Sequence, residues 1–277
     1  MSAPHTEATH VPAQAAPDRY LDVPGARLRY RDEGAGAALL LVHGWTLDLH
    51  MWEPQVTALR QGLRLVRLDR RGHGASEGVA DVRHDAADLA ALARHLVLAP
   101  LAIVGMSQGA RAAAQFALRS PQVRALILDG APDLTLAQAA EDVPIEHFRE
   151  LARRGELATL RREWAAHPLM QLRTREPWAH ELLAATIARY RGADLLATAA
   201  ATEGQDTPLE LSALRQPTLI LCGAQDVPAR VQAARRLAQL LPAAELALVE
   251  GAGHLPNLDN PRRYNELCRS FLLRHRC

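Results

Sequence analysis

The sequence contains no lysine: all 32 basic residues among its 277 positions are arginine. A mechanism that needs a lysine Schiff base is therefore excluded. The formal net charge is only +1, so no excess of one sign favours nucleic acid or an anionic membrane as a partner. Three scattered cysteines, Cys222, Cys268 and Cys277, are too few for a disulfide framework or a zinc site. We expect reduced thiols and, with them, a cytoplasmic protein.

Long hydrophobic runs are also missing. No apolar stretch approaches the ~20 residues that a transmembrane helix needs, and the polar N-terminal stretch lacks the apolar core of a signal peptide. We expect residues 1–18 to form a disordered tail. With 48% hydrophobic and 23% charged residues, the composition is that of a globular protein with a substantial core.

Short apolar runs alternate with helical patterns along most of the chain. Such runs suit strands buried on both faces of a parallel sheet, and they span residues 38–42, 63–68, 101–104, 124–128, 218–221 and 245–249. A strand–turn–strand pattern precedes them at residues 19–23 and 27–31. Helical spacing covers residues 81–97, 110–119, 230–241 and 262–275. This alternation predicts a doubly wound, mostly parallel α/β sheet.

The alternation stops between about residues 133 and 214, where the pattern is helical throughout. Helical spacing within this segment covers residues 146–153, 156–164 and 178–191. We interpret residues 133–214 as a helical cap inserted between two strands of the sheet. Residues 19–132 and 215–277 are then expected to form the α/β core.

The motif Gly-x-Ser-x-Gly occurs twice, around Ser76 and around Ser107. A nucleophile elbow needs a strand that runs directly into a sharp turn opening a helix. Ser107 has this setting, because the strand at 101–104 precedes it and the helix at 110–119 follows it. Its hydroxyl would lie at a helix N-terminus, where developing negative charge is favoured. Ser76 has no helix directly after it, and we interpret it as a loop serine.

The serine needs a base and the base needs a carboxylate. A serine hydroxyl becomes a nucleophile when a neighbouring base takes its proton. His254 is favoured among the 12 histidines, because it lies in a glycine-bearing loop after the last predicted strand. Asp226 follows the strand at 218–221 and gives the order serine, acid, histidine that this architecture requires. Asp129 also ends a predicted strand and stays open as the alternative acid.

Together these residues resemble the α/β-hydrolase family from about Arg19 onward. The matching segments are His43-Gly44-Trp45, the run from Asp69 to Ser76, the turn at Ser107, Asp226 and Gly253-His254. The resemblance implies that the backbone N–H groups of Trp45 and Gln108 form an oxyanion hole, where two donors stabilise a tetrahedral intermediate. It also implies that His43 and His73 shape loops and do not act as bases. We expect no cofactor and no metal.

The helical insertion resembles the cap of this family, which roofs the active site. Candidates for the substrate pocket, with core packing as the alternative for those in the cap, are Met106, Phe148, Trp164, Leu169, Met170 and Trp178. We interpret the cap arginines as a solvated helix face, with an anionic substrate or carrier as the alternative; they are Arg149, Arg153, Arg154, Arg161, Arg162, Arg173 and Arg175.

A serine at the elbow predicts an acyl-enzyme and argues against epoxide hydrolase and haloalkane dehalogenase chemistry, because related enzymes of those kinds carry an aspartate there. We therefore expect a hydrolase of carboxylic esters or lactones that acts on a small-molecule acyl substrate. The alternatives are hydrolysis of a carbon–carbon bond in a diketone and a catalytically silent member that binds small molecules; cofactor-free oxygenation or perhydrolysis is less favoured. The oligomeric state stays open, with a homodimer as one option.

Overall fold

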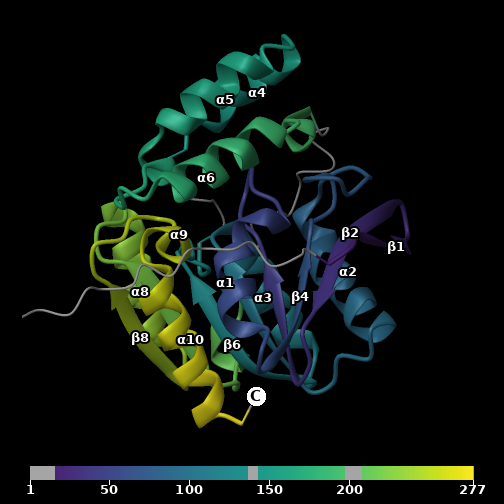
Figure 1. Ribbon diagram of the computed structural model, residues 1–277, viewed down its shortest axis with the longest axis vertical. Helices are drawn as coiled ribbons and strands as arrows, with labels where there is room; N and C mark the ends of the chain where they lie inside the picture. The colour runs from purple at the N-terminus through teal and green to yellow at the C-terminus, as the bar shows by residue number, and fades with distance from the viewer. Residues whose placement is uncertain (1–15, 137–142, 197–207, 277) are drawn as a thin grey trace, which may run out of the picture.

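The computed structural model describes residues 16–136, 143–196 and 208–276, and an eight-stranded sheet forms its centre (Figure 1). The strand order is β1-β2-β4-β3-β5-β6-β7-β8. Strand β2 pairs antiparallel with β1 and β4, and the other neighbouring strands are parallel. The strands span Arg19–Val23 (β1), Ala26–Glu33 (β2), Ala37–Val42 (β3), Leu63–Leu68 (β4), Leu101–Met106 (β5), Val123–Asp129 (β6), Thr218–Gly223 (β7) and Ala244–Val249 (β8). The predicted doubly wound α/β fold is confirmed.

Strand β3 shows why the sheet is covered on both faces. Leu39 and Leu41 belong to one buried cluster, whereas Leu40 and Val42 belong to the other, because successive side chains of a strand point to opposite faces. Helices α1 (Glu53–Leu59) and α10 (Pro261–Arg274) contribute to the first cluster. Helices α2 (Val82–His95), α3 (Gln108–Arg119) and α8 (Pro228–Leu240) contribute to the second.

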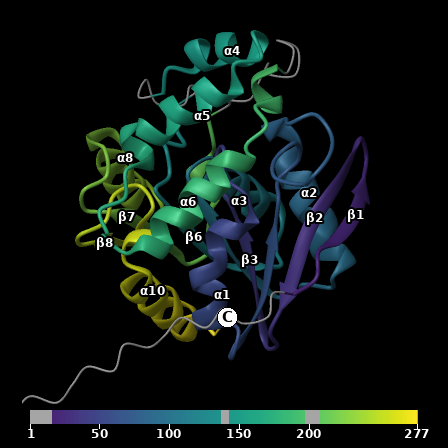
Figure 2. The same ribbon diagram turned by 45° about the horizontal axis from the view of Figure 1, so that its top comes forward.

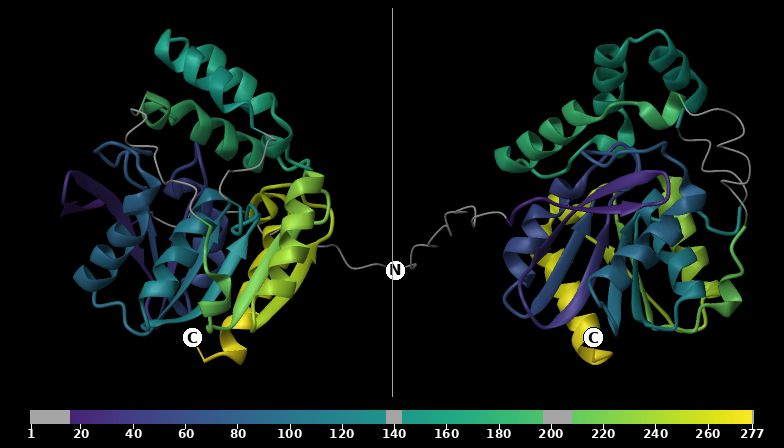
Figure 3. Two further views of the ribbon diagram at one scale, coloured as in Figure 1. Left: turned by 180° about the vertical axis from the view of Figure 1, so that it is seen from behind. Right: turned by 90° about the vertical axis from the view of Figure 1, so that its right-hand side faces the viewer.

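The segment between β6 and β7 holds helices α4 (Ile145–Arg153), α5 (Leu157–Ala166) and α6 (Pro177–Arg189), with short 3-10 turns η2 (Pro168–Met170), η3 (Ala193–Leu196) and η4 (Leu211–Ala213). We use the name cap for the described residues 143–196. The cap helices lie together on one side of the core in every ribbon view (Figure 1, Figure 2 and Figure 3). Within the described ranges, no helix is both long and apolar enough to cross a membrane.

Some elements differ from the sequence-based expectation. Helix α1, the 3-10 turn η1 (Leu49–Trp52) and the short helix α9 (Pro256–Asp259) were not anticipated, because elements of one or two turns carry too few residues for a clear period. Helix α3 begins at Gln108, two residues before the predicted start. Most of the tail expected at residues 1–18 lies outside the described residues.

The candidate residues lie at the carboxyl ends of the parallel strands, along one edge of the sheet. Ser107 directly follows β5, and Asp129 is the last residue of β6. Asp226 lies in the loop after β7, and His254 lies in the loop after β8. The loop after β3, residues 43–48, reaches the same edge, which is where open α/β sheets place their ligands.

Candidate active site

Ser107 is the single residue between strand β5 and helix α3. Its backbone has φ 52° and ψ −117°, and a positive φ is costly for a residue with a Cβ. A Cβ on Gly105 would lie 2.3 Å from the carbonyl oxygen of Gly109, and a Cβ on Gly109 would lie 2.4 Å from that of His43. Close backbone packing therefore requires both flanking glycines, and the turn exposes Ser107 at the end of the sheet.

The structure brings Ser107, His254 and Asp226 together from three separate loops. His254 Nε2 lies 3.2 Å from Ser107 Oγ, and His254 Nδ1 lies 2.8 Å from Asp226 Oδ2. The other oxygen of Asp226 accepts a hydrogen bond from the backbone N–H of Val227 at 2.7 Å. Because a carboxylate only accepts, Nδ1 of His254 carries the proton and Nε2 faces the serine hydroxyl as an acceptor. Both His254 and Asp226 are buried.

Asp129, the alternative acid, lies at the same edge but does not hold the imidazole, whose Nδ1 contacts Asp226. Its backbone carbonyl accepts from the backbone N–H of Ser107 at 2.7 Å, so Asp129 supports the elbow through its main chain. Burial raises the pKa of the Asp129 carboxyl well above its usual value; the Tyr264 hydroxyl opposes this shift and the charge of Asp226 adds to it. A carboxyl with a raised pKa holds its proton more readily and is therefore a poorer partner for an imidazolium ion.

Trp45 and Gln108 are the candidates for an oxyanion hole. Gln108 is the first residue of α3, so its backbone N–H has no acceptor within the helix. Among the described residues, neither its N–H nor that of Trp45 donates a hydrogen bond to another protein group. Both residues line the same cavity as Ser107. Two uncommitted amides beside the serine suit stabilisation of a tetrahedral oxyanion.

His43 and His73 are buried, and each has a ring nitrogen within hydrogen-bond distance of a backbone group. His43 Nε2 accepts from the backbone N–H of Arg70 at 2.9 Å, and its Nδ1 lies 2.7 Å from the carbonyl oxygen of Gly44. Burial lowers the pKa of His43 well below its usual value, and the charges of His73 and Arg70 act in the same direction. Neutral His43 therefore ties two loops together, in the way the family resemblance implies for a loop-shaping residue.

A cavity of about 430 Å³ opens above Ser107 and His254. Met106, Trp164, Leu169 and Met170, which the sequence suggested for the pocket, contribute to its wall. The other two suggested residues are not among the lining residues. Phe148 is buried and packs edge-on against Trp164 at 5.7 Å between ring centroids, and Trp178 packs against the same hydrophobic cluster. Core packing, the alternative weighed for cap residues, describes these two.

Arginines form much of the polar wall of the cavity, but their contacts differ. Arg70 and Arg71, both buried, pair with Asp85 and Asp88 at 2.5 and 2.8 Å. Arg149 is the cap arginine from the sequence-based set that lines the cavity, and it pairs with Glu146. Two others bond elsewhere: Arg161 donates to the carbonyl oxygen of Tyr190 at 2.8 Å, and Arg173 donates to that of Gln225 at 3.2 Å.

Sequence reasoning missed two polar contacts that support this site. Arg70 Nη1 donates to the side-chain oxygen of Gln108 at 2.8 Å, and so reaches a residue of the candidate oxyanion hole from the neighbouring loop. Asp194, in the cap, accepts from the indole N–H of Trp45 at 2.5 Å. Within the described ranges, no three His, Cys, Asp or Glu side chains are grouped so as to hold a metal ion.

Comparison with known proteins gives consistent matches. A family model described as alpha/beta hydrolase fold matches residues 37–261. A pimeloyl-(acyl-carrier protein) methyl ester esterase of Nitrosomonas europaea is 29% identical over 251 residues, which cover 86% of this chain and 97% of that protein. A non-heme chloroperoxidase of Kitasatospora aureofaciens is 29% identical over 253 residues, covering 83% and 89%. The solved structure of a thermophilic esterase from Thermogutta terrifontis has a TM-score of 0.77 at 29% identity and covers 95% of this chain and 99% of its own.

Proposed function

The chain belongs to the α/β-hydrolase fold family, and on that premise we propose that it cleaves carboxylic esters or lactones through an acyl-enzyme on Ser107. The observation that carries the proposal is the line of contacts from Ser107 through His254 to Asp226, at 3.2 and 2.8 Å. A nucleophile, a base within reach of its hydroxyl and a carboxylate that orients the base are the parts that acyl transfer needs. Similarity to proteins named as esterases supports the same class of reaction.

In the first half of the proposed reaction, Ser107 Oγ attacks the carbonyl carbon of the ester while His254 Nε2 takes the hydroxyl proton. The oxyanion that forms accepts hydrogen bonds from the backbone N–H groups of Trp45 and Gln108. Asp226 stabilises the positively charged imidazolium. The tetrahedral species then collapses, the bond to the alcohol oxygen breaks, and His254 returns its proton to the departing alcohol.

In the second half, water replaces the alcohol. His254 takes a proton from the water as its oxygen attacks the acyl carbon, and the same two N–H groups hold the second oxyanion. Collapse breaks the bond to Ser107 Oγ, which recovers its proton from His254. The products are a carboxylic acid and the free enzyme.

The size of the cavity supports a small-molecule substrate as part of this proposal. Its volume of about 430 Å³ falls within the range of sites for small ligands. The apolar part of the wall includes Met106, Trp164, Leu169 and Met170, which suits a short or medium acyl chain. An ester and a lactone differ only in whether the alcohol stays tethered to the acyl group, so both fit this chemistry.

A substrate panel tests the proposal. Wild-type protein and the Ser107→Ala variant are assayed with p-nitrophenyl esters, lactones and meta-cleavage diketones, with the variant as the blank. We expect turnover of esters or lactones well above the blank. Hydrolysis of diketones alone would assign the site to carbon–carbon bond cleavage, and no turnover of any ester or lactone would contradict the proposal.

A further inference from the structure

The loop that follows β3, residues 43–48, is held by the cap as well as by the core. Three pairs of side chains are hydrogen-bonded between the cap and this loop. Hydrogen bonds join Trp45 Nε1 to Asp194 Oδ2 at 2.5 Å, Trp164 Nε1 to Thr46 Oγ1 at 2.6 Å and Arg189 Nε to Asp48 Oδ2 at 2.6 Å. Because Trp45 supplies a donor of the proposed oxyanion hole, these contacts bear on the geometry of the reaction.

Asp194 makes the contact that reaches Trp45 itself. Its Oδ2 accepts from the indole N–H of Trp45, and its Oδ1 accepts from the hydroxyl of Tyr190 at 2.6 Å. The indole of Trp45 also packs edge-on against Trp164 and Tyr190, with ring centroids 4.7 and 5.9 Å apart. Both oxygens of Asp194 therefore accept hydrogen bonds. The side chain of Trp45, which belongs to a loop of the core, packs among residues of the cap.

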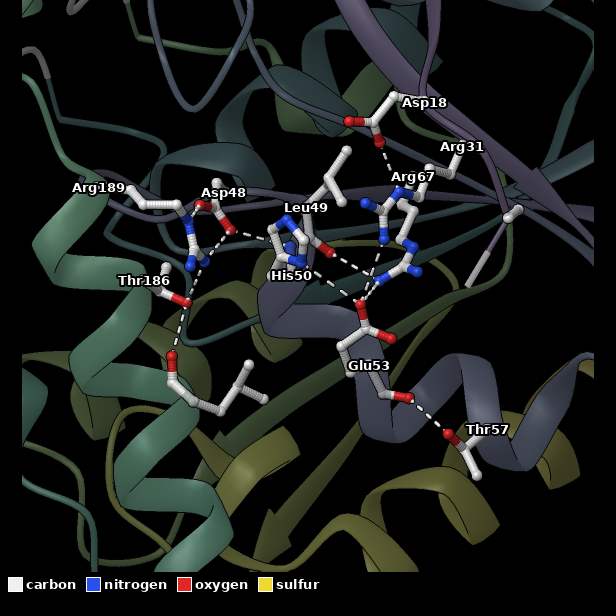
Figure 4. Close-up of polar contacts among 12 residues, drawn as sticks. Asp18, Arg31, Asp48, Leu49, His50, Glu53, Thr57, Arg67, Thr186 and Arg189 are labelled. Carbon is white, nitrogen blue, oxygen red and sulfur yellow. Dashed lines mark hydrogen bonds and ion pairs between the residues drawn. The ribbon is translucent and has the colours of Figure 1, made fainter. Parts of the chain in front are cut away.

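The backbone of this loop needs such support. Thr46 is buried and has φ 61°, a conformation that β-branched residues rarely adopt and that strains the backbone. A strained residue keeps its conformation only when its surroundings hold it. Two residues later, Asp48 accepts from the backbone N–H of His50 at 2.9 Å and begins the turn η1. Figure 4 shows Arg189, which projects from α6, facing the same carboxylate.

We propose that Asp194 is a positioning residue: through the indole of Trp45 it fixes the direction of the backbone N–H that binds the oxyanion. This inference rests on the proposed function, because the N–H matters only when a tetrahedral species forms on Ser107. Oxyanion donors must lie about 2.7–3.1 Å from the charged oxygen, and a misplacement of ~1 Å can lower a rate ~100-fold. Loss of this contact should therefore slow formation of the tetrahedral species more than it weakens substrate binding.

Three variants separate this role from a general role in holding the cap. Asp194→Leu removes both acceptor oxygens at similar size. Asp194→Asn keeps an acceptor for the indole N–H and offers an amide donor to the oxygen of Tyr190. Arg191→Gln is the matched control, because Arg191 Nη2 donates to the backbone oxygen of Ser76 at 2.6 Å. The control breaks a cap-to-core contact from the same segment that does not involve residues 43–48.

Two measurements are made on each variant: kcat and KM with a p-nitrophenyl ester, and the second-order rate of labelling by a fluorophosphonate, whose phosphonyl oxygen also occupies the oxyanion hole. We expect Asp194→Leu to lower kcat and the labelling rate about 10- to 100-fold, while KM changes less than about threefold. Asp194→Asn should recover most of both rates. Arg191→Gln should stay within about threefold of wild type in both.

A double-variant cycle decides whether Asp194 acts through Trp45. In a Trp45→Phe background, which lacks the indole N–H, Asp194→Leu should have little further effect on either rate. Equal losses in both backgrounds, or a rise in KM that accounts for the loss, would overturn the proposal. Wild-type protein that takes the label but cleaves no ester or lactone would refute the proposed function alone, and the labelling rates would still decide on Asp194. Wild-type protein that does neither would overturn both.

Discussion

The two Gly-x-Ser-x-Gly segments share a pattern and differ in every contact that their serines make. Ser76 is fully buried, and its hydroxyl accepts from the backbone N–H of Arg29 at 2.8 Å and donates to the carbonyl oxygen of Asp69 at 2.7 Å. Ser107 lines the cavity, and its hydroxyl faces His254 Nε2 at 3.2 Å. The hydroxyl of Ser76 is hydrogen-bonded to backbone groups on both sides. The hydroxyl of Ser107 faces an imidazole and borders the cavity.

The glycines of the two segments also serve different purposes. Gly105 and Gly109 let the turn at Ser107 pack against the neighbouring backbone. Gly74 has φ 51°, and a Cβ there would lie 2.1 Å from Oδ2 of Asp69, so this glycine makes room for a buried carboxylate. The pattern therefore specifies a tight turn in both places. The strand before it and the helix after it determine whether the serine can react.

Replacement of each serine by alanine should give the largest difference between the two segments. Ser107→Ala should lower kcat for an ester by roughly 10⁴-fold or more, because the nucleophile is lost. Ser76→Ala should keep kcat within about threefold but lower the free energy of unfolding by about 1–3 kcal/mol, because two buried backbone groups lose their partner. The measurements are steady-state kinetics and urea unfolding. A large loss of kcat in a folded Ser76→Ala protein would contradict the assignment.

The two strand-end carboxyls provide the next test. Asp226→Asn should lower kcat on the order of 10³- to 10⁴-fold at neutral pH, because the amide stabilises the wrong tautomer of His254. Asp129→Asn should stay within about threefold, because His254 Nδ1 contacts Asp226 and not Asp129, and an amide is close in size to a carboxyl. Kinetics at pH 7 compare the pair. If Asp129→Asn is the more damaging change, the orienting acid lies on β6.

Esters with alcohol groups of different size test how much space lies in front of Ser107. Trp45 follows a single glycine and lines the cavity, so its indole should crowd a bulky alcohol beside the scissile carbonyl. We expect kcat/KM for a tert-butyl ester to be lower than for the ethyl ester of the same acid by a factor on the order of 10², since a displaced carbonyl loses contacts in the oxyanion hole. Comparable values for the two esters would show that Trp45 does not limit this space.

The carboxyl of Asp129 also makes the stability of the protein depend on pH. Because burial raises its pKa, the folded protein keeps a proton that the unfolded chain releases above about pH 4. The stability that this group contributes is full below that pH and is lost as the pH rises through the folded-state pKa. Asparagine does not titrate, so the Asp129→Asn variant does not lose this stability as the pH rises. Its free energy of unfolding relative to that of wild type should therefore increase by up to about 1.4 kcal/mol per pH unit. Urea unfolding at pH 5 and pH 8 measures the change; a difference independent of pH would exclude a protonated Asp129.

Much of this arrangement could be predicted from local sequence. The strand at residues 63–68 is predicted with the bounds that the structure gives β4, because Leu63, Leu65, Val66 and Leu68 form a short, mainly apolar run. The order of Ser107, Asp226 and His254 followed from their places after predicted strands, since the carboxyl ends of parallel strands share one edge. These are properties of short segments and of topology.

Contacts across long separations could not be predicted in this way. Asp194 lies 149 positions after Trp45, and no period or spacing in the sequence relates the two. Phe148 and Trp178 have the same apolar character as Trp164, and only the packing of the cap helices determines that Trp164 reaches the cavity. The raised pKa of Asp129 likewise depends on its complete burial, which the sequence of β6 alone does not reveal.

The most direct test of the account is to find the residue that a fluorophosphonate modifies. The wild-type protein is labelled, digested and mapped by mass spectrometry, with Ser107→Ala and Ser76→Ala treated in parallel. We predict one modified peptide, which carries the label on Ser107, with labelling lost in Ser107→Ala and retained in Ser76→Ala. A label on Ser76, or labelling of Ser107→Ala as strong as that of wild type, would contradict the assignment of Ser107 as the nucleophile.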